Sequence, residues 1–167
     1  MKWQLLVVML AIGALAMSAH AEEFAMKSWG EGAPGLHVSL PAGWTYVPRE
    51  GPDFDVHFFT GPGDQCTIGI YVGMHPNPRA RAEPEGIQSR TAGRVLGKVV
   101  HWTDMRRHGE AGEFSFSEAI VEHAFAGKAT NARPVVNDLS LHLMISAPTP
   151  QLRDSCRELL SALDLAR

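Results

Sequence analysis

The chain has 167 residues, of which 45% are hydrophobic and 20% charged, and its formal net charge is -3. This composition is that of a globular protein, and it excludes a disordered polar chain, a collagen-like fibre and a cysteine-dense miniprotein. The small net charge argues against nucleic acid as the main partner.

The N-terminal segment is typical of a cleaved secretory signal. Met1 and Lys2 begin it, an unbroken apolar run covers 5–16, and Ala19-His20-Ala21 places small residues where a signal peptidase reads them. The run is shorter than the ~20 residues that a membrane anchor needs. We therefore predict a signal peptide over 1–21 and one mature domain over 22–167. The mature protein is expected in the periplasm or outside the cell, with no membrane anchor after cleavage.

The first half of the mature domain predicts strands. Alternating or extended apolar segments cover 36–40, 44–47, 54–60 and 66–72, with a loop over 48–52. A helix is expected over 83–94, because Pro84 is tolerated in a first helical turn, although Gly86 and Gly93 weaken it.

The second half predicts three further strands and a last helix. The strands cover 95–105, 114–125 and 138–147, and in the last of them Leu139, Leu141, Leu143 and Ile145 share one face. Thr149 is placed to cap a helix whose apolar stripe contains Leu152, Cys156, Leu159, Leu160 and Leu163. Strands in runs joined by short turns predict an α+β domain with a largely antiparallel sheet of roughly six strands.

The chain has two cysteines, Cys66 and Cys156. An exported protein folds in an oxidising compartment, and Cys156 lies on the helix stripe that faces the sheet carrying Cys66. We predict that they form a disulfide. Two free buried thiols are the alternative.

The segment Leu36-His37-Val38-Ser39-Leu40-Pro41-Ala42-Gly43-Trp44 resembles the opening of PsbP-like domains, which include the bacterial DcrB-like proteins. The later order of elements is similar over nearly the whole mature chain. The resemblance implies a six-stranded antiparallel sheet with helices on both faces, an α/β/α sandwich. It also implies docking or accessory work, and it offers no catalytic residues to carry over.

Seven histidines follow the signal segment, which raises the question of a metal site. Metal sites usually draw ligands from tight spacings or clear clusters, and no His-Glu-x-x-His occurs here. We expect exposed strand histidines, no metal and no cofactor. The alternative is a site assembled across strands, for example with Glu118 or Glu122 beside His123. The histidines are His37, His57, His75, His101, His108, His123 and His142.

The sequence carries no motif that indicates an enzyme. It lacks the Gly-x-Ser-x-Gly elbow of many hydrolases. The carboxylate pairs Asp53/Asp55 and Glu118/Glu122 have the spacing of solvated strand or turn positions. We expect no catalytic residues.

Basic side chains are concentrated in residues 79–107, which contain seven basic and three acidic residues. An ordinary solvated surface is one interpretation. The other is a charged surface that steers a partner, for which we name Arg90, Arg94, Arg106 and Arg107 as candidate contacts.

These features favour a noncatalytic accessory protein that binds a protein partner in the cell envelope. One version is an immunity protein that blocks an envelope-targeted toxin. The alternatives are a metal- or small-ligand-binding protein and an envelope hydrolase.

Overall fold

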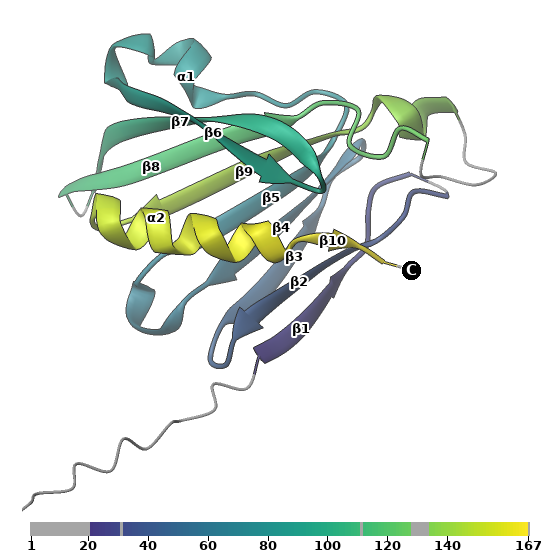
Figure 1. Ribbon diagram of the computed structural model, residues 1–167, viewed down its shortest axis with the longest axis horizontal. Helices are drawn as coiled ribbons and strands as arrows, with labels where there is room; N and C mark the ends of the chain where they lie inside the picture. The colour runs from purple at the N-terminus through teal and green to yellow at the C-terminus, as the bar shows by residue number, and fades with distance from the viewer. Residues whose placement is uncertain (1–20, 31, 111, 128–133, 167) are drawn as a thin grey trace, which may run out of the picture.

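The computed structural model describes residues 21–30, 32–110, 112–127 and 134–166, so nearly all of the predicted signal peptide lies outside it. In this part of the chain two antiparallel sheets face each other and one longer helix packs beside the smaller sheet (Figure 1). The smaller sheet has the order β1-β2-β10. Its strands are β1 (Ala21–Met26), β2 (Leu36–Pro41) and β10 (Asp164–Leu165).

The larger sheet has seven strands among the described residues, in the order β3-β4-β5-β9-β8-β7-β6. Its strands are β3 (Thr45–Glu50), β4 (Phe54–Thr60), β5 (Thr67–Gly73), β6 (Ile87–Val95), β7 (Lys98–Gly109), β8 (Gly112–Val121) and β9 (Ser140–Ala147). The helices are α1 (Arg79–Ala82) and α2 (Pro150–Leu159), with short 3-10 turns η1 (Pro62–Asp64), η2 (Pro84–Gly86), η3 (Pro134–Asp138) and η4 (Leu160–Ala162). Within these residues no helix is both long and apolar enough to cross a membrane.

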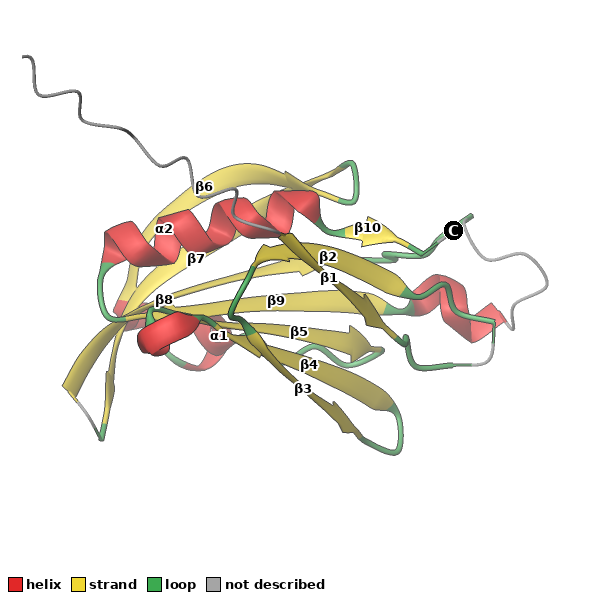
Figure 2. Ribbon diagram, turned by 90° about the horizontal axis from the view of Figure 1, so that it is seen from below, coloured by secondary structure: helices red, strands yellow, loops and turns green. Residues whose placement is uncertain are grey.

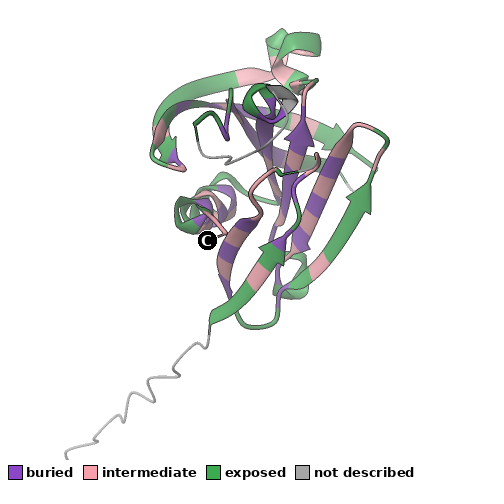
Figure 3. Cartoon of the chain, turned by 90° about the vertical axis from the view of Figure 1, so that its right-hand side faces the viewer, coloured by how far each residue is buried: buried purple, intermediate pink, exposed green. Residues whose placement is uncertain are grey.

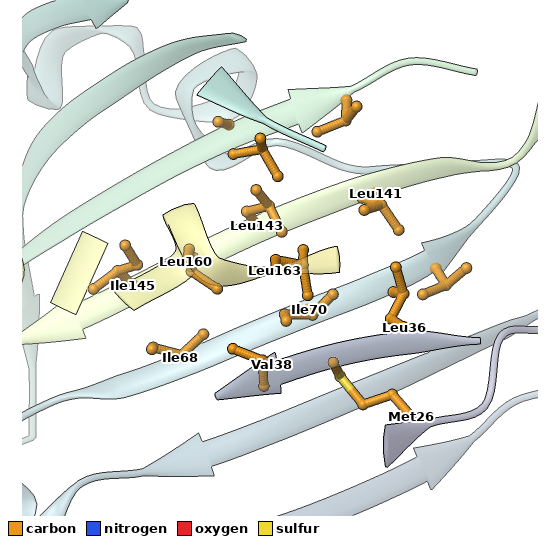
Figure 4. Close-up of a cluster of buried hydrophobic side chains, with 14 of the residues drawn as sticks. Met26, Leu36, Val38, Ile68, Ile70, Leu141, Leu143, Ile145, Leu160 and Leu163 are labelled. Carbon is orange, nitrogen blue, oxygen red and sulfur yellow. The ribbon is translucent and has the colours of Figure 1, made fainter. Parts of the chain in front are cut away.

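The core lies between the two sheets and under α2. Burial alternates along the strands, so one face of each strand points inward (Figure 3). Figure 4 shows side chains of β1, β2, β5 and β9 converging with Leu160 and Leu163, which follow α2, on one apolar cluster. The predicted apolar face of β9 is confirmed, since Leu139, Leu141, Leu143 and Ile145 are fully buried.

Helix α2 begins and docks as the sequence predicts. The Thr149 hydroxyl accepts a hydrogen bond from the Leu152 amide and caps the helix. Cys156 is bonded to Cys66 across 90 positions of sequence, so the predicted disulfide is confirmed. The bridge fastens α2 to the start of β5.

The other side of α2 contacts the β6–β7 hairpin through polar groups. The Arg157 guanidinium pairs with Asp104 and lies 5.2 Å from the centre of the Trp102 ring. It also donates to the Thr91 hydroxyl on β6 at 3.0 Å. These contacts hold β6 and β7 along α2, and Figure 2 shows both strands curving around the helix.

The predicted helix over 83–94 is wrong, because most of that segment is strand β6. β6 pairs with β7 through a two-residue turn in which Leu96 and Gly97 have φ of 51° and 75°. Two positive φ values match the twist of adjacent strands, so this turn closes a tight hairpin. At Gly93 a side chain would come within 2.9 Å of the Trp102 ring, so glycine lets β6 cross that buried indole.

The α+β class is confirmed, but the α/β/α sandwich with helices on both faces is not what the structure shows. One face of the larger sheet packs on the smaller sheet and α2. The other face is crossed by the segment that joins β5 to β6, with the single turn of α1. The domain is therefore mostly β. The predicted extended segment over 44–47 continues through Pro48 as far as Glu50, because β3 is an edge strand and an edge tolerates proline.

Candidate functional site

The ladder between β7 and β8 opens before either strand ends. Their pairing runs from Gly109 with Gly112 to Thr103 with Glu118, and stops there. β7 continues from Thr103 back to Lys98, paired with β6, while β8 continues to Val121, paired with β9. We call the unpaired stretch, 98–102 of β7 opposite 119–122, the seam. It opens where the β6–β7 hairpin curves toward α2 (Figure 2).

Backbone groups of both strands point into the seam. The two-residue turn makes Lys98 direct its backbone to Val95 of β6, and alternate residues follow it. The backbone groups of Val99 and His101 therefore point the other way, toward β8. By the same alternation from Glu118, those of Ile120 point toward β7. Among the described residues, no β7–β8 pair includes Val99, His101 or Ile120.

A hollow of about 510 Å³ lies over the seam. Its volume is in the range of ligand sites, roughly 300–1,000 Å³. Buried Val100, Ala119 and Val121 contribute an apolar floor, and polar residues such as His101, Thr103 and Glu122 stand around it. The lining residues are Pro78, Ala80, Lys98, Val99, Val100, His101, Thr103, Glu118, Ala119, Ile120, Val121 and Glu122.

Lys98 bridges the outer end of the seam. Its Nζ donates to the carbonyl oxygens of Glu122, at 3.1 Å, and of His123. These two bonds tie the start of β7 to the residues after β8. The hollow therefore lies between Lys98 at one end of the seam and the last pair, Thr103 with Glu118, at the other.

The crossover between β5 and β6 forms one wall of the hollow, and Glu118 holds it there. Glu118 Oε1 accepts from the Ala80 amide at 2.6 Å, and Oε2 accepts from the Arg79 amide at 2.9 Å. The His142 Nε2 atom also lies 2.9 Å from Glu118 Oε2. The Glu118 and His142 side chains are 3% and 5% exposed, so this pair is nearly excluded from water.

The environment keeps Glu118 ionised. Burial alone would raise the pKa of Glu118, but the hydrogen bonds from His142 and from the Ala80 and Arg79 amides outweigh burial and lower it. An ionised carboxylate accepts only, so His142 donates through Nε2. The carboxylate is thus used to fix the crossover, and its remaining capacity to serve a ligand is small.

The four arginines named as candidate partner contacts do not form one patch. Arg90 is exposed on β6 and pairs across the strand with Thr103, which lines the hollow. Arg94 folds back onto the hairpin turn and donates to the Gly97 carbonyl. Arg106 lies 3.5 Å from Glu113 on the α2 side of the sheet, and Arg107 pairs with Glu83 at 3.0 Å. Arg90 and Arg94 are therefore the two beside the hollow, since Arg94 pairs across the strand with Val99, which also lines it.

The histidines divide into buried and exposed ones, which corrects the expectation that strand histidines are exposed. His57 and His142 are 2% and 4% exposed. His142 is covered by the crossover, and His57 lies against Tyr46, whose hydroxyl is 2.9 Å from His57 Nδ1. A polar position in an alternating strand therefore does not predict an exposed side chain where a second layer covers that face of the sheet.

Within the described part of the chain, no three histidine, cysteine, aspartate or glutamate side chains are arranged to hold a metal ion. The suggested grouping of Glu118 or Glu122 with His123 is wrong for Glu118, which is bound to His142 instead. The His123 Nδ1 atom lies 3.1 Å from the Asn137 carbonyl oxygen.

Sequence reasoning missed the seam altogether. Both strands have ordinary strand patterns on either side of Thr103 and Glu118. The opening depends on how the β6–β7 hairpin bends toward α2, which is set by contacts between distant residues such as Arg157 and Asp104. Lys98, which bridges the end, carries no signal beyond its charge.

No family model matches the sequence, and no curated protein matches it. Several solved structures match it, and two of them illustrate the shared fold. LpqN, described as involved in cell envelope biogenesis of Mycobacterium tuberculosis, has a TM-score of 0.50 at 14% identity, over 89% of this chain and 92% of LpqN. A protein of Bacteroides thetaiotaomicron VPI-5482 has a TM-score of 0.50 at 10% identity, over 79% of this chain and 45% of that protein. This chain thus spans less than half of the Bacteroides protein. At these identities the similarity establishes the fold alone.

Proposed function

We propose that this chain is a noncatalytic binding protein, exported to the periplasm or the exterior, which holds a protein partner at the seam. One observation carries the proposal. The hollow combines an apolar floor with polar rim groups and with backbone groups that no neighbouring strand occupies. Apolar depth with a few directed polar groups is the usual form of a binding site, and free strand backbone is a common means of binding polypeptide.

The export half of the proposal rests on separate observations. Disulfides such as Cys66–Cys156 persist in oxidising compartments outside the cytoplasm. The sequence of 1–21 is that of a secretory signal. LpqN, which shares the fold, is described as acting in cell envelope biogenesis. All three favour a protein that works in the envelope or beyond it.

The hydrogen bonds of Glu118 support a noncatalytic role. It is the buried carboxylate at the hollow, and both of its oxygens are engaged in holding the crossover. The PsbP-like resemblance of residues 36–44 predicts accessory work as well. The hollow has no feature that distinguishes an immunity protein from other proteins that bind a protein partner.

The test places a large side chain in the hollow by substitution. Val99 lines it with 59% of its surface exposed, and Val47, which is 52% exposed on β3 at the opposite edge of the sheet, provides a matched control. Immobilised wild type, Val99→Trp and Val47→Trp are incubated with envelope extract, and the partner found by mass spectrometry is purified for direct titration. We expect Val99→Trp to lose binding of the partner, while the wild type and Val47→Trp keep it. A partner bound equally by all three proteins would remove the seam from the function.

A further inference from the structure

Resting on the proposed function, we infer that the bound part of the partner is an acidic extended segment that pairs with the free backbone of β7 and β8 at the seam. Three features lie together at the seam: an open strand ladder, an apolar floor, and arginines on the flanking elements that have no carboxylate partner among the described residues. Each of the three restricts the chemistry of the occupant.

The open ladder selects an extended polypeptide. His101 offers an N–H and a carbonyl oxygen on one side of the seam, and Ile120 offers the same pair on the other. Free groups of this kind are a template for another strand. A polypeptide meets them with main-chain groups repeating at about 3.3 Å per residue, whereas a compact ligand has no such repeat.

The floor selects an alternating side-chain pattern. Val100, Ala119 and Val121 lie at its base and are each 3% exposed or less. Successive residues of an extended segment point to opposite sides. Apolar side chains at every second position would therefore face this floor, and the residues between them would face outward to the rim.

The charge around the hollow selects acidic residues for those outward positions. Arg79 and Arg81 flank Ala80, which lines the wall, and Arg90 pairs across the strand with Thr103. Among the described residues, none of these three arginines has a carboxylate within 4.0 Å.

The nearby carboxylates do not cancel this charge. The carboxylates near the hollow are the ionised Glu118, the exposed Glu122 and, on the crossover, Glu83 and Glu85. Glu83 is paired with Arg107, so the remaining carboxylates are fewer than the basic side chains. Lys98 adds a further positive charge at the outer end of the seam. The surroundings of the hollow therefore favour a negatively charged partner segment.

The experiment uses labelled peptides with the mature wild-type protein at ~0.15 M salt, where exposed charges are screened beyond roughly 8 Å. The probe is acetylated Glu-Val-Glu-Val-Glu-Val amide. One comparison peptide has Lys for each Glu, and another has Pro for the two inner Val. Affinity is read by fluorescence anisotropy, and the site is read by amide hydrogen exchange at His101 and Ile120.

We expect the acidic alternating peptide to bind at least about tenfold more tightly than either comparison peptide, and to slow exchange at both amides. Arg90→Glu should weaken it by roughly two- to fivefold. Arg106→Glu should not, because Arg106 is on the α2 side of the sheet.

Equal binding of the lysine peptide would overturn the acidic assignment, and equal binding of the proline peptide would overturn strand pairing. Failure of all three peptides to bind at millimolar concentration would overturn the inference as a whole. If Val99→Trp still discriminated a purified partner in that case, the proposed function would stand without this occupant.

Discussion

Glu118 and His142 lie on neighbouring strands of the larger sheet, and their side chains meet at 2.9 Å beneath the crossover that walls the hollow. The Arg79 and Ala80 amides complete the carboxylate's set of donors. A single buried side chain thus fixes a surface segment to the sheet at the last β7–β8 pair. The wall of the proposed binding site depends on it.

Replacing Glu118 with glutamine should destabilise the protein by about 3 kcal/mol, because the new amide N–H₂ faces donors on at least one side and the buried pair is broken. Urea unfolding of Glu118→Gln and of the exposed Glu122→Gln measures this. Glu122→Gln should change the free energy of unfolding by less than about 0.5 kcal/mol. Similar values for the two variants would show that Glu118 does not hold the crossover.

The disulfide should contribute a large share of the stability. In the chain-entropy model, closing a loop of this size stabilises by about 4–5 kcal/mol. The double variant Cys66→Ala/Cys156→Ala should therefore lose roughly 3–5 kcal/mol of unfolding free energy. Thiol labelling of the denatured, unreduced wild type should find no reactive cysteine. Two labelled cysteines, or an unchanged denaturation midpoint in the double variant, would contradict the account.

His57 should make stability depend on pH. Burial lowers the pKa of His57, and the Lys27 backbone offsets only part of that. An unfolded histidine has a pKa of about 6.5. As pH falls, the unfolded state therefore binds the proton at a higher pH than the folded state does. Stability should therefore fall as pH drops from about 6.5 toward the lowered folded-state pKa.

In His57→Asn the unfolding free energy should fall less steeply as pH drops below about 6.5. The measurement is the unfolding free energy at several pH values. The exposed His108→Asn is the matched control and should keep the wild-type slope. A slope that is the same in wild type and His57→Asn would show that another group titrates in this range.

Local patterns predicted the elements whose residues carry their own signal. The strand over 54–60 agrees with β4, the apolar face of β9 is buried, and Thr149 caps α2. Each of these follows from side-chain periodicity or from one capping residue. The disulfide was predictable because only two cysteines exist and helical periodicity turns Cys156 inward.

The failures share a different cause, which is pairing and packing with other segments that the pattern inside one segment does not show. Residues 87–95 form a strand because a two-residue turn brings them against β7 and Arg157 reaches across to Thr91. β1 was not predicted because most of its side chains are exposed, and β10 was not predicted because it has two residues and its partner β2 lies far from it in sequence. The burial of His57 likewise comes from β1, whose Phe24 packs on Tyr46 and Phe59.

The seam is the hardest of these to foresee, because it is an absence of pairing between two well-formed strands. Its position follows from competition between sheet continuity and the docking of the β6–β7 hairpin on α2, where Arg157 contacts Asp104 and Trp102. The residue pattern of a single strand predicts neither the pairing of β7 with β8 nor the docking of the hairpin on α2.

The most direct test of the seam is amide hydrogen exchange in the free protein, measured by NMR. The His101 and Ile120 amides point into the seam, while those of Met105 and Phe116 belong to the paired part of the same two strands. We predict that His101 and Ile120 exchange about a hundredfold faster or more, because no neighbouring strand accepts from them. Equal protection of all four amides would show that the ladder is closed in solution, and it would remove the site on which the proposed function rests.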